Sequence, residues 1–231
     1  MNTGKVKLAE VEKPVSQAAR VAGILQGMIT NNELPPGSNY LEAELGEMLG
    51  VSRTPIREAA VILASRGLVE IRPRHGIRVL PLTIADMVEI YDILIELEPL
   101  AAFKAAERAY PEKDLSGLDE SLTQMEAALK REARKEWAAA DDRFHQGLVS
   151  LSGSRRLEEV IAMYSTQVHR VRLLTLYMRP LPHASNENHR ALYDAIRNAE
   201  PERARDLHHE HRVEAKALLI SLLEQNNLSR F

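Results

Sequence analysis

Residues 45–79 decide the fold of this chain, and they read LGEMLGVSRTPIREAAVILASRGLVEIRPRHGIRV. A short amphipathic segment ends at Gly50, and a second helix is predicted to begin near Ser52 and to end at Gly67, because glycine commonly terminates helices. Two short strands with an arginine-rich turn between them follow. The order helix, turn, helix and strand hairpin predicts a helix-turn-helix unit with a wing.

The second helix of this unit has an apolar stripe at helical spacing, formed by Ile56, Ala59, Ala60 and Leu63. Burial of that stripe turns Arg53 and Arg57 toward solvent. Ser52 or Thr54 is expected to cap the helix, and Pro55 is tolerated in its first turn.

The amino-terminal end of this helix carries the residues that a DNA-reading helix needs. Side chains near the start of a recognition helix reach base edges in the major groove, and arginine pairs with guanine through two hydrogen bonds. The expected DNA contacts therefore come from Ser52, Arg53, Thr54 and Arg57. In the wing, Gly76 lets the backbone turn tightly, and His75 and Arg74 at the tip are expected to enter a minor groove. The alternative is that these arginines only solvate a small helical domain.

Charge is distributed unevenly along the chain. Residues 51–80 contain six arginines against two glutamates, whereas residues 81–231 carry more acidic than basic side chains, within a formal net charge of −3. A local positive surface on an acidic body suits a single DNA-binding face.

The composition of the 231 residues limits the possible classes of protein. There is no cysteine, which excludes disulfides, thiolate metal sites and cysteine nucleophiles. The chain has no long apolar run and no hydrophobic leader, so a cytoplasmic protein without membrane contact is expected.

The rest of the sequence predicts a mainly α-helical protein with two domains. Residues 1–14 are expected to form a mobile tail, residues 15–80 the winged helix-turn-helix domain, and residues 81–231 an antiparallel α-helical bundle. A capping-box pattern at Thr83–Asp86 is expected to open the first helix of the bundle. Other helices are expected near residues 16–31, 41–49, 53–66, 114–132, 135–151, 155–178, 185–199 and 201–226. In helix 41–49 the side chains expected to face the core are Leu41, Leu45, Met48 and Leu49.

The strings GVSRTPIREA (50–59), GLVE (67–70) and RPRHGIRV (72–79) closely resemble the winged helix-turn-helix of GntR-type bacterial transcription regulators. The resemblance implies DNA contacts from Ser52, Arg53, Thr54 and Arg57, and a wing tip at His75 and Gly76. Three positions depart from the common pattern. Ala43 replaces a phosphate-binding arginine, and Gly46 and Ala60 replace alanine and leucine.

Histidines and acidic residues gather in the predicted bundle. Asp141 and His145 are four residues apart and share a helix face, while His189 and His211 lie on the last two predicted helices. One carboxylate and three imidazoles suit Zn²⁺, with Ni²⁺, Mn²⁺ or Fe²⁺ as alternatives. Asp142 and His208 are competing ligands, while His183 and His209 are expected to be solvated.

The segments DDRFHQGLVSLSGSRRL (141–157), ENHRALYDAI (187–196) and ERARDLHHEH (202–211) resemble the ligand-sensing domain of the FadR-type branch of GntR regulators. The resemblance implies a divalent ion held by Asp141, His145, His189 and His211, with open positions for a small organic acid. Relatives often carry an effector-binding arginine where this chain has Leu94, and Arg170 and Arg172 are candidates to replace it. Asn188 and Ser154 also depart from the pattern.

These features favour a ligand-responsive transcription regulator, most simply a homodimeric repressor on a pseudo-palindromic operator. A metal sensor, in which the ion itself is the signal, is one alternative. A metal-dependent hydrolase or lyase with Glu187 or Asp142 as the base is another, but it leaves the DNA-binding head unexplained.

Overall fold

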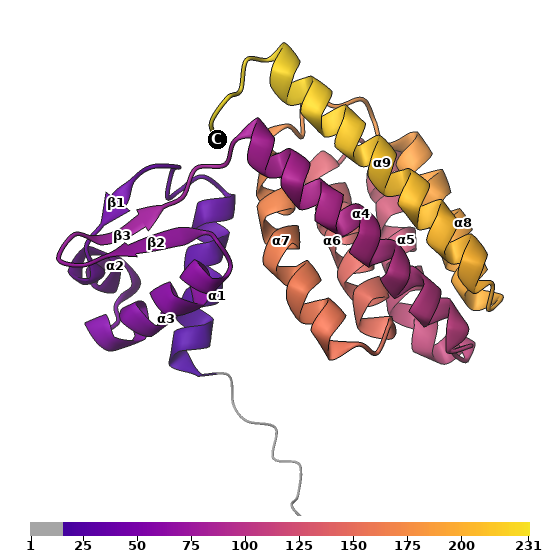
Figure 1. The fold of residues 1–231 in the computed structure, drawn as a ribbon, viewed down its shortest axis with the longest axis horizontal. Coiled ribbons are helices and arrows are strands. Elements are labelled where there is room, and N and C mark those ends of the chain that lie inside the picture. The colour runs from indigo at the N-terminus through magenta and orange to yellow at the C-terminus, as the bar shows by residue number, and fades with distance from the viewer. Residues whose placement is uncertain (1–15) are drawn as a thin grey trace, which may run out of the picture.

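The computed structural model describes residues 16–231, so the predicted tail at residues 1–14 lies outside the described residues. Figure 1 shows a small N-terminal head beside a larger bundle of helices. The head contains α1 (Gln17–Thr30), β1 (Asn39–Tyr40), α2 (Glu42–Leu49), α3 (Arg53–Ser65), β2 (Val69–Arg72) and β3 (Gly76–Val79). The bundle contains α4 (Ile84–Glu107), the short 3₁₀ helix η1 (Glu112–Leu115), α5 (Ser116–Lys130), α6 (Arg134–Leu151), α7 (Arg155–Leu174), α8 (His183–Arg197) and α9 (Pro201–Gln225). The mainly helical fold predicted from the sequence is confirmed.

The head has a hydrophobic core of its own between α1, α3 and the sheet. The predicted stripe of α3 is buried, as are Val21, Leu25 and Ile29 on α1. Burial of such side chains contributes roughly 1.5–3 kcal/mol each. This core holds α3 with its Arg53 and Arg57 side chains exposed.

The orientation predicted for the helix at 41–49 is wrong in part. Leu45 is buried, but Leu41 and Met48 are 48% and 52% exposed. Helix α2 begins only at Glu42, which leaves Leu41 at the N-cap. Its buried face is centred between Leu45 and Gly46, and at 100° per residue Met48 points away from that centre. A Cβ at Gly46 would lie 2.8 Å from the Val51 carbonyl oxygen, so the turn packs too closely for alanine.

The wing is a three-stranded antiparallel sheet in the order β1-β3-β2. The hairpin of β2 and β3 agrees with the sequence, but the two-residue strand β1 is too short to give an alternating pattern. Gly76 has a φ of 81°, and a Cβ there would lie 2.1 Å from the carbonyl oxygen of Tyr40. Glycine is therefore required where the wing folds back on β1.

The bundle begins with the predicted capping box. The Thr83 hydroxyl accepts a hydrogen bond from the Asp86 backbone N–H at 3.1 Å, and the Asp86 carboxylate accepts one from the Thr83 N–H at 2.7 Å. Helices α4 and α9 run side by side across one face of the bundle (Figure 1). None of the helices in residues 16–231 is both long and apolar enough to cross a membrane.

Helix α7 of the bundle forms hydrogen bonds with the head and with the linker that follows it. The Gln167 side-chain amide donates to the Arg66 carbonyl at 3.1 Å, and the Arg170 guanidinium donates to the Leu80 carbonyl at 2.9 Å. Both acceptors lie at the edge of the head or in the linker that leaves it. The position of the head is therefore tied to the position of α7.

Candidate metal centre and nucleic-acid interface

The exposed end of α3 presents the predicted DNA-contact residues together. Ser52, Arg53 and Thr54 are all exposed, and Ser52 occupies the N-cap without making a side-chain cap hydrogen bond. Its hydroxyl and the first backbone N–H groups of the helix are therefore available to a phosphate. His75 is exposed at the tip of the wing, next to Arg74.

Arg57 is held by a residue that the sequence did not indicate. Its Nε and Nη2 atoms donate to the two carboxylate oxygens of Glu42 at 3.0 and 2.9 Å, and its side chain remains 71% exposed. The Glu42 carboxylate raises the pKa of Arg57 above its ordinary value. Glu42 thereby fixes the direction of a guanidinium on the outer face of α3.

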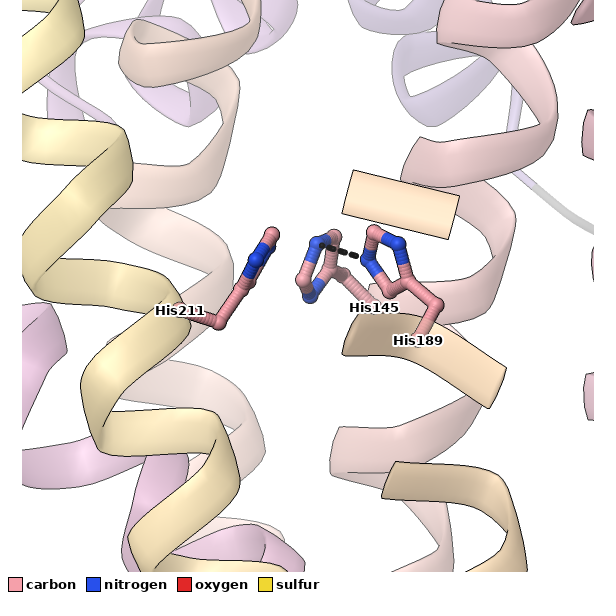
Figure 2. Close-up of side chains that lie close together, drawn as sticks. All are labelled: His145, His189 and His211. Atoms are coloured by element: carbon pink, nitrogen blue, oxygen red, sulfur yellow. Dashed lines mark hydrogen bonds between the residues drawn. The ribbon is translucent and has the colours of Figure 1, made fainter. Parts of the chain in front are cut away.

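The bundle brings together the four residues predicted to bind a metal. Asp141 and His145 come from α6, His189 from α8 and His211 from α9, and all four are buried. Figure 2 shows the three imidazoles facing one another, with His145 Nε2 at 3.2 Å from His189 Nε2. One ligand atom of each histidine lies within 4.8 Å of the others. Asp141 lies 3.8 Å from His145 Nε2 and 3.6 Å from His189 Nε2.

Burial keeps these imidazoles neutral. It lowers the pKa of His189 to about 4, and it lowers the pKa values of His145 and His211 well below 6.5, helped by neighbouring positive charge. Neutral imidazole is the form that binds a metal ion.

The Asp141 carboxylate is 1% exposed, and neither of its oxygens accepts a hydrogen bond of regular geometry within the described residues. Arg172 Nη2 lies 2.6 Å from Asp141 Oδ2. Burial disfavours the charged form of Arg172, but the Asp141 carboxylate outweighs it and raises the pKa of Arg172. A buried carboxylate beside three neutral imidazoles is a donor set that fits a divalent ion.

A second buried group lies against the first. Glu98 on α4 accepts hydrogen bonds from His208 Nε2 at 3.0 Å and from Arg212 Nε at 2.7 Å. Burial opposes ionisation of Glu98, but Arg212 and His208 hold its pKa below the ordinary value. Sequence reasoning considered His208 only as a competing ligand and missed Glu98 and Arg212, because charged residues on helices are usually solvated.

Two cavities reach this region. One, of about 190 Å³, is lined by His211, Arg172, Arg179 and Trp137, among others. The other, of about 260 Å³, is lined by Glu98, His145, Leu94 and Arg212 from the bundle and by Gln26 and Thr30 from α1.

Arg179 gives the first cavity an additional cation. Burial, helped by neighbouring Arg172, lowers the pKa of Arg179 to about 10. Sequence patterns did not indicate this role, because α7 ends at Leu174 rather than near 178 and Arg179 lies in the turn that follows.

The other candidate residues lie elsewhere. Arg170 is at the junction with the head, and Asp142 lies 3.6 Å from His169. His183 and His209 are exposed, as predicted, and so is Glu187.

The fold and the site define a class of protein: a regulator with a winged DNA-binding head and a helical sensing bundle. Residues 17–79 match the model of the bacterial regulatory proteins of the gntR family, and residues 89–214 match the FCD domain. The chain belongs to the GntR family of transcription regulators, in the FadR-type branch that carries the FCD domain.

Individual relatives agree with this assignment. An HTH-type transcriptional regulator encoded in the TAR-I ttuE-ttuC′ intergenic region of Agrobacterium vitis is 41% identical over 59% of this chain and 82% of its own length. The probable D-xylose utilization operon transcriptional repressor of Paenarthrobacter nicotinovorans is 31% identical over 81% of each chain. The solved structure of E. coli McbR/YncC superposes with a TM-score of 0.77 at 26% identity, covering 90% of this chain and 99% of the other. The two curated relatives are named as transcriptional regulators rather than enzymes, which argues against the hydrolase alternative.

Proposed function

We propose that this regulator binds a pseudo-palindromic operator as a homodimer and represses transcription until a small organic acid binds its bundle. The DNA contacts would come from Ser52, Arg53, Thr54 and Arg57, with His75 and Gly76 in the wing. The exposure of the recognition-helix residues supports this assignment, as does the relative that is named a probable repressor.

The proposed metal ligands are Asp141, His145, His189 and His211, with Zn²⁺ as the first choice and Ni²⁺, Mn²⁺ or Fe²⁺ as alternatives. The buried Asp141 carboxylate beside His145 and His189, together with the neutral imidazoles, supports this assignment. When bound, such an ion would supply open coordination positions for an oxygen ligand.

The proposed effector site is the cavity lined by Arg172, Arg179 and His211. Two partly buried guanidinium groups suit a carboxylate, and Trp137 and Leu218 in the same lining suit an apolar body. Of the two arginines that the sequence offered, Arg172 is retained here. Arg170 instead receives the role of holding the linker from the head against α7.

The main support for the proposal is that one helix, α7, contacts both the candidate metal centre and the linker to the head. Arg172 lies at the candidate metal centre, and Arg170, two residues away on α7, donates to the Leu80 carbonyl beside the head. An effector that binds one placement of α7 more tightly than another would therefore also favour one placement of the head.

The test combines thermal melting with operator binding. Purified protein is melted with individual carboxylic acids, with and without a chelator, because binding to the native state alone raises the midpoint. We expect an acid that raises the melting temperature only with metal present and that also releases operator DNA. If the chelator alone releases the operator and no acid has an effect, the ion is the signal and the effector proposal is wrong.

Arg170→Ala tests the transmission step. The variant is expected to keep the melting shift caused by the acid but to lose most of the acid's effect on operator affinity, because the contact with the linker is gone. Arg155→Ala, at an exposed arginine on the same helix, is the matched control. Full response to the acid in Arg170→Ala would contradict transmission through this contact.

A further inference from the structure

The group of Glu98, His208 and Arg212 lies directly behind the candidate metal centre. Glu98 and His208 are almost completely buried, and Arg212 is 3% exposed. Arg212 reaches one oxygen of Glu98 through both Nε and Nη2, and His208 donates to the same oxygen. Burying a charged group is costly unless it is paired, so this arrangement calls for a functional explanation.

His145 lies between this group and the metal centre. Its Nε2 faces His189 Nε2 at 3.2 Å and Asp141 at 3.8 Å. On the other side of the ring, His145 Nδ1 accepts a hydrogen bond from Arg212 Nη2 at 3.4 Å, and Glu98 Oε2 lies next to it at 3.6 Å. The two ring nitrogens therefore face two different groups.

An imidazole that binds a metal through Nε2 carries its proton on Nδ1, and that N–H group needs an acceptor. Glu98 is the carboxylate nearest to His145 Nδ1. His189 repeats the arrangement, because its Nδ1 lies 3.4 Å from the hydroxyl of Ser185 while its Nε2 faces the centre. In both histidines, an oxygen atom of another side chain therefore lies near Nδ1, on the side of the ring away from the centre.

Glu98, His145 and His208 are also close enough together to hold an ion themselves. However, the Arg212 guanidinium hydrogen bonds to Glu98 through two nitrogens and approaches His145 Nδ1. The group already contains a cation, so a second metal ion there would have to displace a buried arginine.

We propose that ion binding at His145 Nε2 places the ring proton on Nδ1, and that Glu98 is the positioning residue that then accepts the Nδ1–H hydrogen bond in place of the Arg212 contact. Arg212 and His208 hold the carboxylate in place, and Arg212 neutralises its charge. This inference rests on the proposed metal centre at Asp141, His145, His189 and His211.

The experiment compares two double variants of the full chain. Glu98→Leu with Arg212→Met removes the carboxylate and its cation together, because exchanging a buried ion pair for apolar residues is often tolerated. Asp92→Leu with Lys216→Met is the matched control, because this more exposed ion pair joins the same two helices, α4 and α9. Zn²⁺ affinity is measured by competition with a chromophoric chelator, and melting curves verify folding.

We expect the Zn²⁺ affinity of the first variant to fall by about 10–100-fold, the usual effect of losing an outer partner of a metal-bound histidine. The control is expected to match the wild type. Equal affinity in the two folded variants would overturn the role of Glu98 while leaving the metal centre intact. Failure of the wild type to bind Zn²⁺ would overturn the metal centre, and the inference with it.

A second measurement decides the question even if the first variant does not fold. Nitrogen-15 NMR of zinc-loaded wild-type protein identifies the His145 nitrogen that carries the metal. We expect zinc on Nε2 and a slowly exchanging proton on Nδ1. Zinc on Nδ1 would place the ion in the Glu98 group and overturn the proposal.

Discussion

The head and the bundle differ in how their functional residues are distributed along the chain. The proposed DNA contacts of the head lie within residues 52–76, on one helix start and one hairpin. The proposed metal ligands of the bundle lie on three helices between residues 141 and 211. A site made from one local motif depends on the fold of its own segment, whereas the bundle site exists only when distant helices pack correctly.

The largest effect is expected at the metal centre. His211→Ala should reduce Zn²⁺ affinity by more than about 100-fold, because it removes a direct ligand rather than an outer partner. His209→Ala is the control, since His209 lies two residues away on α9 and is exposed. Chelator competition measures both variants. Similar affinities would show that His211 is not a ligand.

Arg53→Ala is expected to weaken operator binding without changing the bundle. A base contact of arginine is worth about 1–3 kcal/mol, so each half-site should lose roughly 10–100-fold in affinity. Fluorescence anisotropy with operator DNA measures the loss, and Zn²⁺ affinity should remain at the wild-type value. Arg155→Ala controls for the general loss of a positive charge. Wild-type operator affinity in Arg53→Ala would contradict the assignment of the recognition helix.

Acid is expected to destabilise the metal-free bundle. The pKa of His189 is about 4 in the folded protein, against an ordinary value of 6.5. Below pH 6.5 the unfolded chain takes up a proton that folded His189 resists, so stability is full above pH 6.5 and falls toward pH 4. The slope is about 1.4 kcal/mol per pH unit for each such proton.

The fluorescence of Trp137 is the measurement for this prediction. Trp137 is the single tryptophan and is buried in the bundle, so urea titrations between pH 4.5 and 8 report on the bundle alone. His189→Gln should reduce the slope, and the contribution of His145 and His211 should remain. A variant with an unchanged slope would mean that His189 is not the residue responsible.

The smallest effect is expected at Glu42. Glu42→Gln removes the charge that directs the Arg57 guanidinium, so the preorganisation of this side chain for DNA is lost. The ratio of operator affinity to affinity for scrambled DNA is therefore expected to fall about five-fold, as measured by anisotropy at fixed salt. Glu47→Gln, at an exposed glutamate later on α2, is the control. A rise in this ratio would mean that Glu42 competes with DNA for Arg57.

Sequence patterns predicted the head well because its interactions are local. The α3 stripe and the positive φ of the wing glycine follow from spacing or backbone geometry within a few residues, as does the capping box at Thr83 that opens the bundle. The prediction was wrong for Leu41 and Met48, because the buried face of α2 is set by close contact with the turn at Val51.

The sequence alone determined the type of the long helices and of the wing hairpin, the helix-turn-helix order and the residue types of both candidate sites, because periodicity and chain geometry are written along the chain. Tertiary structure alone decided which charges become buried partners. It placed Glu98 behind His145, Arg172 beside Asp141 and Arg170 at the head. The reason is physical: adjacent turns of one helix face different neighbours, and only packing shows whether a charged side chain meets water or another charge.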